Sequence, residues 1–174
     1  MSDNRRAIYT AEAYVTGGRA EGHGRTYDGA LEVDLRTPGE LGGSGGGTNP
    51  EQLFAVGYAA CFESALGVVG RRHRQDVGDV AIDSRVSLLP TKDHAFKLAV
   101  GLAVRLPSVD DPEVAKQLVT EADRVCPYSN AVRGNVDVWL TVNGRPIGDR
   151  SEYSRGRTGS TEKSPPRADD IRAA

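Results

Sequence analysis

Residues 49–73 read NPEQLFAVGYAACFESALGVVGRRH, and they predict a long helix with a clear start and a clear end. Asn49 belongs to the residue types that cap a helix, and Pro50 suits the first helical position, where no N–H is needed. Glu51 faces the positive end of the helix dipole, and the basic residues at positions 71–73 suit its negative end. We therefore expect the helix to begin after Asn49 and to end near position 73.

The interior of this helix, residues 53–70, is apolar on almost every side. Glu63 and Ser64 interrupt it, so the stretch falls short of the ~20 apolar residues that a membrane span requires. We therefore expect a helix buried in protein. Because a single sheet covers only one side of such a helix, we expect a second copy of the chain to cover the rest.

Strands are predicted on both sides of the helix, because apolar residues alternate there with polar ones. A second helix is predicted to begin at Asp111, since an apolar stripe follows at helical spacing. The sequence thus predicts an α+β fold in which antiparallel sheets surround a long buried central helix. The predicted strands are residues 8–15, 24–28, 31–37, 80–88, 98–106 and 136–142.

The pattern changes after Asn143. Charged residues, Gly, Pro and Ser dominate from residue 144 onward, and no apolar periodicity continues. Such a composition cannot bury enough apolar surface to form a packed core. We therefore expect one domain over residues 1–143 and a disordered polar tail over residues 144–174.

The composition limits the class of protein. Lys and Arg total 22 against 24 Asp and Glu, so no positive excess indicates nucleic acid or an anionic membrane. Two cysteines in 174 residues cannot form a secreted disulfide scaffold, and the three histidines have no spacing typical of metal ligands. The first ten residues, MSDNRRAIYT, contain no apolar signal region. We expect a cytoplasmic protein without a metal site.

The glycine-rich segment of residues 39–50 precedes the long helix. It lacks the lysine motif of phosphate-binding loops. A hinge, or backbone packed closely against its surroundings, is the favoured interpretation.

Cys61 and Cys126 are the residues that offer unusual reactivity. They are 65 positions apart, so they form neither a CxxC redox pair nor a zinc knuckle. Free cysteines are often inert core residues, and the residues alone leave that alternative open. A reactive thiolate needs a cation or donor nearby, for which Arg19 and Arg133 are candidates.

Two segments resemble the signatures of a known family. TNPEQLFAVGYAACF, residues 48–62, and VCPYSNAVRGNVDV, residues 125–138, closely resemble those of the organic hydroperoxide resistance proteins, the Ohr branch of the OsmC/Ohr superfamily. Arg19 stands where that family carries an arginine. The resemblance spans residues 8–142 and implies an OsmC/Ohr-like fold. Val132 departs from the pattern, since threonine is usual there.

The resemblance implies a thiol peroxidase that uses no metal and no bound cofactor. Cys61 would attack an organic hydroperoxide and become a sulfenic acid, and Cys126 would resolve it as an intramolecular disulfide. A dithiol reductant, the dihydrolipoyl group of a lipoylated protein, would recycle that disulfide. Arg19 would favour the thiolate of Cys61, and Glu51 would hold the Arg19 guanidinium through a bidentate pair.

Aromatic residues near both cysteines are the candidate substrate-binding surface: Phe54, Tyr58, Phe62 and Tyr128. An apolar substituent gains ~25 cal/mol for each Å² that it buries there, which hydrogen peroxide cannot. The alternative is a non-catalytic OsmC-like binding or regulatory module that uses the tail as its contact element. The two cysteines argue against it, because such a module needs neither.

The spacing on the long helix bears on the oligomeric state. Glu51 and Cys61 are ten positions apart, which is ~15 Å along a straight helix. Two such helices packed antiparallel about a two-fold axis would place the start of one beside the middle of the other. We therefore expect an intertwined, obligate homodimer whose two sites each combine Cys61 of one subunit with Glu51, and Arg19, of the other.

Overall fold

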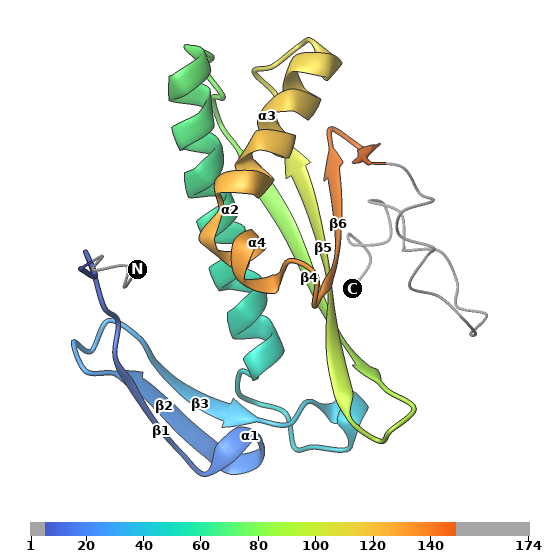
Figure 1. Cartoon of the computed structure of the whole chain (residues 1–174). Coiled ribbons are helices and arrows are strands. Elements are labelled where there is room, and N and C mark those ends of the chain that lie inside the picture. Colours follow the sequence, from blue (N-terminus) through green and yellow to red (C-terminus); the bar gives the residue numbers. More distant parts are fainter. Residues whose placement is uncertain (1–5, 149–174) are drawn as a thin grey trace, which may run out of the picture. The chain divides into compact units, whose positions relative to one another are not determined.

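The structure is a computed structural model that describes residues 6–148. The chain divides into two compact units, with the boundary between residues 53 and 54. Each unit is described by itself. The long helix continues from the end of the first unit into the second (Figure 1).

The first unit is an antiparallel sheet of three strands in the order β1-β2-β3. The strands are β1 (Ala13–Thr16), β2 (Gly22–Thr26) and β3 (Glu32–Arg36). A single helical turn, α1 (Gly18–Glu21), connects β1 to β2. Gly17 precedes that turn and Gly18 begins it. Their φ values of 70° and 64° are ones that residues with side chains rarely adopt. All three strands were predicted, although β1 begins later than position 8.

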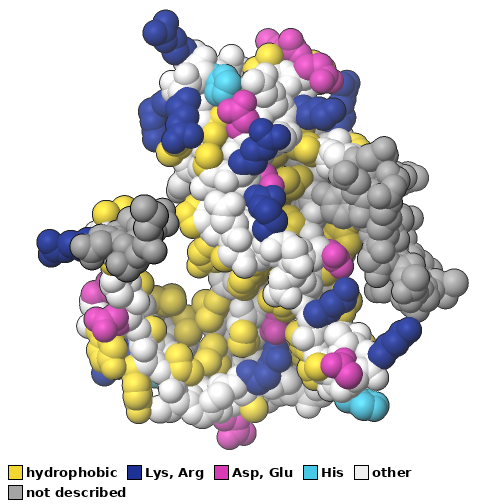
Figure 2. All heavy atoms as spheres, viewed as in Figure 1, with side chains coloured by type: hydrophobic (Ala, Val, Ile, Leu, Met, Phe, Trp, Pro, Cys, Tyr) yellow, Lys and Arg dark blue, Asp and Glu magenta, His cyan; other side chains and the backbone are white. Residues whose placement is uncertain are grey.

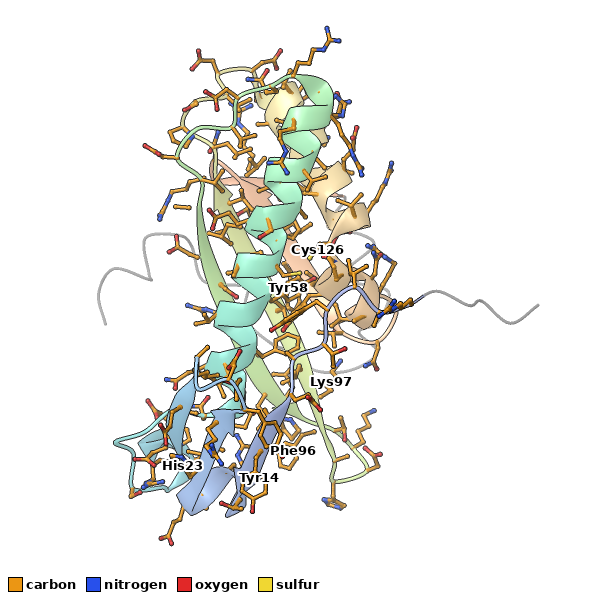
Figure 3. The ribbon with its side chains drawn as sticks, turned by 90° about the vertical axis from the view of Figure 1, so that its left-hand side faces the viewer. Tyr14, His23, Tyr58, Phe96, Lys97 and Cys126 are labelled. Carbon is orange, nitrogen blue, oxygen red and sulfur yellow. The ribbon has the colours of Figure 1, made fainter. Side chains whose placement is uncertain are left out.

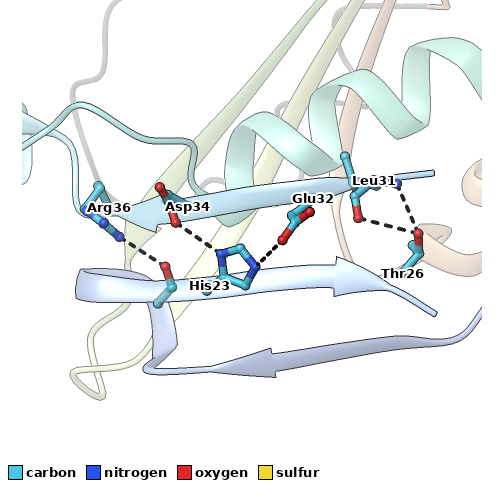
Figure 4. Close-up of polar contacts among 7 residues, drawn as sticks. His23, Thr26, Leu31, Glu32, Asp34 and Arg36 are labelled. Atoms are coloured by element: carbon cyan, nitrogen blue, oxygen red, sulfur yellow. Dashed lines mark hydrogen bonds and ion pairs between the residues drawn. The ribbon is translucent and has the colours of Figure 1, made fainter. Parts of the chain in front are cut away.

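His23 joins two strands of this sheet (Figure 4). Its Nδ1 lies 3.1 Å from Oδ1 of Asp34, and its Nε2 lies 3.1 Å from Oε1 of Glu32. The hydrogen bond with Asp34, followed by the interactions with Glu32, raises the pKa of His23. Each ring nitrogen faces a carboxylate, so the cluster becomes a cross-strand ion pair when the imidazole is protonated.

The glycine-rich segment packs closely against β3. It contains the short 3₁₀ helix η1 (Gly39–Leu41). A side-chain carbon on Gly43 would overlap the carbonyl oxygen of Thr37, and one on Gly47 would lie 2.6 Å from the carbonyl oxygen of Asp34. Of the two interpretations made from sequence, close backbone packing is the one that these contacts support.

Helix α2 (Pro50–His73) has the bounds that the sequence predicts. The backbone N–H of Gln52 donates to Oδ1 of Asn49 at 2.9 Å, and the N–H of Asn49 donates to Oε1 of Gln52 at 3.2 Å. These reciprocal bonds form a capping box, which satisfies two N–H groups that the helix itself cannot pair.

By length and composition alone, α2 is able to span a membrane, contrary to the prediction from residues 53–70. The helix extends beyond that stretch at both ends to 24 residues, and its most apolar 18-residue window has a mean hydropathy of 1.6. One such helix is weak evidence, because the core helix of a globular protein passes the same test. Within this chain 33% of the window is buried.

The second unit has a four-stranded sheet in the order β4-β5-β6-β7, and α2 and α3 cover one of its faces (Figure 1). The strands are β4 (Ala81–Pro90), β5 (Phe96–Arg105), β6 (Asp137–Val142) and β7 (Arg145–Ile147). The helices after α2 are α3 (Pro112–Val125) and α4 (Pro127–Val132). The core contains Phe62 and Leu66 of α2, Val100 and Leu102 of β5, and Leu118 and Ala122 of α3.

The α+β class is confirmed, and the purely antiparallel sheet is wrong at one pair. Strand β6 runs parallel to β5, with Val100 opposite Val138. Helices α3 and α4 lie between these strands in the chain, and a crossover of that length returns the chain to the same end of the sheet. The second helix was predicted correctly: Oδ1 of Asp111 accepts hydrogen bonds from the N–H groups of Glu113 and Val114.

The predicted domain end at Asn143 is also wrong, because it falls inside the hairpin of β6 and β7. Ile147 pairs with Leu140 and is only 8% exposed, so it belongs to the core. A three-residue strand leaves too short an alternation to be recognised in sequence. The predicted tail from residue 149 onward lies outside the described residues.

The hairpin leads to a prediction about truncation. A chain that ends after Gly148 should keep its melting temperature and its activity, because the residues removed lack apolar periodicity. A chain that ends after Asn143 loses β7 and the burial of Ile147, worth about 1.5–3 kcal/mol, and should melt several degrees lower. Thermal denaturation of both truncations measures this. A large drop for the chain ending at Gly148 would contradict it.

Candidate active site

The two cysteines meet in the second unit. Cys61 lies in the middle of α2 and is partly exposed, whereas Cys126 lies between α3 and α4 and is completely buried. Their Sγ atoms are 3.6 Å apart, and both cysteines are free. A disulfide has an S–S length of about 2.05 Å, so oxidation of this pair to a disulfide would need only a small approach of the sulfurs.

The corner that carries Cys126 is fixed to α3. The Cys126 N–H donates to the carbonyl of Ala122, which closes α3, and Pro127 begins α4 at a position where no N–H is needed. The Arg133 guanidinium donates to a carboxylate oxygen of Asp123 at 2.9 Å and to the carbonyl of the same residue at 2.8 Å. Arg133, considered from sequence as a cation for the thiolate, therefore stabilises the end of α3 instead.

A second contact joins α2 to α4 beside the thiols. The hydroxyl groups of Tyr58 and Ser129 form a buried hydrogen bond of 2.9 Å. Tyr58 and Cys126 lie close together in Figure 3, where α2 meets the corner between α3 and α4. Burial, the largest cause, raises the pKa of Tyr58 to about 12. Neither Ser129 nor α4 was predicted from sequence, although Pro127 after Cys126 is a recognised helix-start signal.

Three aromatic rings cluster around this contact. The ring centroids of Phe54, Tyr58 and Tyr128 lie 5.7–5.9 Å from one another. Tyr128 also packs on α2 at Gly57, where a side-chain carbon would lie 3.1 Å from the tyrosine hydroxyl. Of the four aromatic residues predicted to bind substrate, the structure brings together these three.

Phe62 departs from that prediction. Its side chain and that of Tyr58 are both 0% exposed, so neither presents surface to a substrate in this conformation. Phe62 instead belongs to the hydrophobic core between α2 and the sheet. Phe54 is half-buried and Tyr128 is exposed, and these two rings offer an apolar surface next to the thiols.

The pKa of the Cys61 thiol is raised above its ordinary value. Burial is the main cause, because it disfavours the charged thiolate, and the neighbouring Cys126 adds to the increase. A hydrogen bond from the backbone of Tyr128 acts in the opposite direction. The resemblance implied a favoured thiolate, and the contacts of Cys61 within this unit do not supply one.

Arg19 and Glu51 are paired within the first unit. Nη2 of Arg19 lies 2.6 Å from Oε2 of Glu51, and the Glu51 side chain is 18% exposed. The expected bidentate pair is a single contact here. The Nε atom of Arg19 is buried and has no hydrogen-bond partner among the described residues, so this donor is free for another acceptor.

The remaining candidates supply no site. Among residues 6–148, no group of three or more His, Cys, Asp or Glu side chains is placed to hold a metal ion. His73 pairs with Glu121 at 2.7 Å, and His94 is exposed. A cavity of about 300 Å³ lies between the start of α3 and the β6–β7 hairpin, but neither cysteine lines it.

Comparison with known proteins gives consistent matches. The profile of the OsmC-like protein family matches residues 43–141. The chain is 48% identical over 146 residues to the organic hydroperoxide resistance protein of Xanthomonas axonopodis pv. citri, which covers 82% of this chain and 99% of that protein. It is 45% identical over 137 residues to OhrB of Bacillus subtilis, covering 78% of this chain and 98% of that protein.

Solved structures agree with these matches. The crystal structure of an organic hydroperoxide resistance protein from Legionella pneumophila has a TM-score of 0.75 and 52% identity, and covers 79% of this chain and 98% of the other. A second, from Vibrio cholerae, has captopril bound in one of its active sites. Its TM-score is 0.78 at 45% identity, over 84% of this chain and 100% of the other.

Proposed function

Because this chain belongs to the OsmC-like protein family, within its organic hydroperoxide resistance group, we propose that it is a thiol-dependent peroxidase. The chain has a role in organic hydroperoxide resistance and thus in the response to oxidative stress. The observation that carries the proposed mechanism is the 3.6 Å separation of two free thiols that differ in burial. The proposal places the protein in the cytoplasm, where thiols are kept reduced.

The proposed reaction has two oxidative steps. The Cys61 thiolate attacks the outer oxygen of ROOH, the O–O bond breaks, and the alkoxide takes a proton to leave as the alcohol ROH. Cys61 becomes a sulfenic acid. The Cys126 sulfur then attacks the Cys61 sulfur, which forms the disulfide and releases water. The more exposed thiol thus meets the peroxide, and the buried one meets only its neighbour.

Recycling needs a dithiol. One thiolate of the reductant attacks the Cys61–Cys126 disulfide and forms a mixed disulfide with the protein. The second thiol of the reductant then attacks that mixed disulfide, so both cysteine thiols are restored and the reductant becomes a disulfide. We propose a dihydrolipoyl group on a lipoylated protein as this reductant. Its flexible apolar arm suits the exposed ring of Tyr128 beside Cys61.

Arg19 and Glu51 are assigned to the same reaction. Burial raises the pKa of Cys61, so a cation is required to favour the thiolate. Arg19 supplies a guanidinium cation, and its Nε–H, which has no partner among residues 6–148, is a donor for a sulfur or a peroxide oxygen. Glu51 holds the guanidinium through the 2.6 Å contact.

A homodimer is part of the proposal. A sheet of three strands needs a buried apolar face, yet both faces of β1 are exposed, with Tyr14 at 51% and Val15 at 56%. Hydrophobic side chains are visible at the surface of the molecule (Figure 2). Val56 on α2 is 72% exposed as well. A second copy of the chain, related by a two-fold axis, presents the same apolar surface, so each copy covers the exposed residues of the other. Size-exclusion chromatography with light scattering tests this, and a monomer would remove it.

One titration separates the proposed peroxidase from a non-catalytic module. Reduced protein is treated with one equivalent of an organic hydroperoxide, and free thiols are counted before and after. A peroxidase loses both thiols, because Cys61 is oxidised and Cys126 condenses with it. Retention of both thiols would reject the enzyme and favour the binding module.

Substrate choice should follow apolar burial at Phe54 and Tyr128. An aryl or fatty-acid hydroperoxide that buries ~100 Å² of its substituent gains ~2.5 kcal/mol, nearly a hundredfold if the contact is realised in the transition state. We therefore expect kcat/KM for cumene hydroperoxide to exceed that for hydrogen peroxide by more than tenfold. Stopped-flow kinetics with both peroxides measures the ratio. Equal values would leave a general thiol peroxidase.

A further inference from the structure

We propose that the Tyr58–Ser129 hydrogen bond positions the two thiols for disulfide formation, so that both residues act in the resolution step without touching the substrate. This inference rests on the proposed peroxidase function and assigns to that site a pair of positioning residues. Tyr58 thereby changes from the expected substrate contact to a support.

The spacing of the residues carries the first step. Tyr58 precedes Cys61 by three positions on α2, so both side chains lie on one face of that helix. On the facing element, Ser129 of α4 follows Cys126 by three positions. One hydrogen bond of 2.9 Å and one sulfur pair at 3.6 Å therefore link the same two elements, a single turn apart.

Burial makes this bond consequential. Tyr58 is 0% exposed and Ser129 is 1% exposed, so water cannot replace a missing partner. A buried hydroxyl without a partner is costly, which gives α4 a strong preference for the position in which the bond forms. The raised pKa of Tyr58 keeps its hydroxyl neutral over the whole physiological range.

Apart from the backbone of Tyr128, which bonds the Cys61 thiol itself, the other polar contacts of this corner lead to α3. Asn130 donates to the carbonyl of Arg124 and Arg133 donates to Asp123, and both acceptors belong to α3. Those bonds hold Cys126 to its own helix. The Tyr58–Ser129 bond holds that corner to α2, where the sulfenic acid forms.

The consequence is a competition between two fates of the Cys61 sulfenic acid. Condensation with Cys126 requires the sulfurs to approach from 3.6 Å to a bonding distance of about 2.05 Å. If the corner moves away, the sulfenic acid waits and reacts with a second ROOH, which gives the sulfinic acid and another ROH. The hydrogen bond thus protects Cys61 from irreversible oxidation.

The test uses Tyr58→Phe, which removes one hydroxyl and keeps the ring beside Phe54 and Tyr128. Full-length protein is titrated with cumene hydroperoxide, and intact mass gives the ratio of sulfinic acid to disulfide. We expect this ratio to rise about tenfold, the effect of losing one buried hydrogen bond on the competing step. The rate of the first oxidation should stay within about twofold of the wild type, because Cys61 still meets the peroxide.

Further variants identify the cause. Ser129→Ala should raise the ratio similarly, and the double variant no further, since both changes remove one shared bond. Ser129→Thr keeps the hydroxyl and should restore most of the disulfide. Ser64→Ala is the matched control, because it removes a hydroxyl of α2 that bonds only the carbonyl of Ala60.

Each outcome decides between hypotheses. A wild-type protein that forms no disulfide with peroxide rejects the proposed function itself. A wild type that forms the disulfide, together with an unchanged ratio in folded Tyr58→Phe, rejects the positioning role alone. If Tyr58→Phe fails to fold, as judged by its melting temperature, the same comparison is made between Ser129→Ala and Ser129→Thr.

Discussion

We expect that replacing Cys61 with serine will abolish turnover of organic hydroperoxide, a loss of at least about 10³-fold, and that replacing Cys126 with serine will leave the first oxidation intact. The structure gives the two thiols unequal positions: Cys61 is partly exposed on α2, and Cys126 is buried beside it. In the proposed reaction, the thiol that reaches the peroxide bears the sulfenic acid. The Cys126→Ser protein should therefore consume about one equivalent, stall, and proceed to the sulfinic acid with excess peroxide.

Intact mass of the oxidised proteins is the decisive measurement. The wild type should lose two hydrogens, and peptide mapping should find the Cys61–Cys126 link. Arg133→Ala serves as a variant at the same corner that removes no thiol. An oxidised wild type without that link would overturn the assignment of Cys126. A small thiol could resolve the sulfenic acid in place of Cys126. Turnover of Cys126→Ser with a dithiol would therefore not be enough to overturn that assignment.

Local signals explain what could be predicted from sequence. The bounds of α2 and the start of α3 follow from Asn49 and Asp111, each of which caps its helix through its own side chain. Alternation of apolar residues located the strands, because the period of side-chain direction in a strand is two. These features depend on neighbours within a few positions.

Long-range features could not be predicted in this way. The parallel pairing of β5 and β6 depends on how α3 and α4 cross the sheet, which no alternation pattern records. Phe62 looks like a substrate contact by type, and only packing against the sheet shows that it belongs to the core. The direction of the Cys61 pKa shift could not be predicted either, because burial is its main cause and the sequence does not give the burial of a single position.

The candidate site was predicted through its cysteines and missed in its support. Cys61 and Cys126 stood out because each is the sole nucleophilic thiol of its segment. Ser129 is an ordinary residue in a short turn of helix, and the role proposed for it depends on a partner 71 positions away. Such a contact becomes visible only when the two elements are placed together.

The second large effect concerns which subunit completes each site. On α2, Glu51 and Cys61 are separated by ten residues, about 15 Å along a regular helix, which is too far for one glutamate side chain. We propose that Cys61 of one subunit works with Arg19 and Glu51 of the other. Cys61→Ser and Glu51→Ala should each be inactive alone, and refolding an equal mixture should restore roughly one quarter of wild-type activity. Half of the dimers are then mixed, and one of their two sites is intact.

The Arg19–Glu51 contact supplies the control for this experiment. Since these two residues pair within one chain, Arg19→Ala mixed with Glu51→Ala damages both sites of every mixed dimer, and no activity should return. Recovery in that control would place the two residues in different sites. Failure of the first mixture, when native mass spectrometry shows that mixed dimers form, would mean that each site is built within one chain. The pair of mixtures therefore distinguishes a shared site from a local one, whatever the absolute rate of the enzyme.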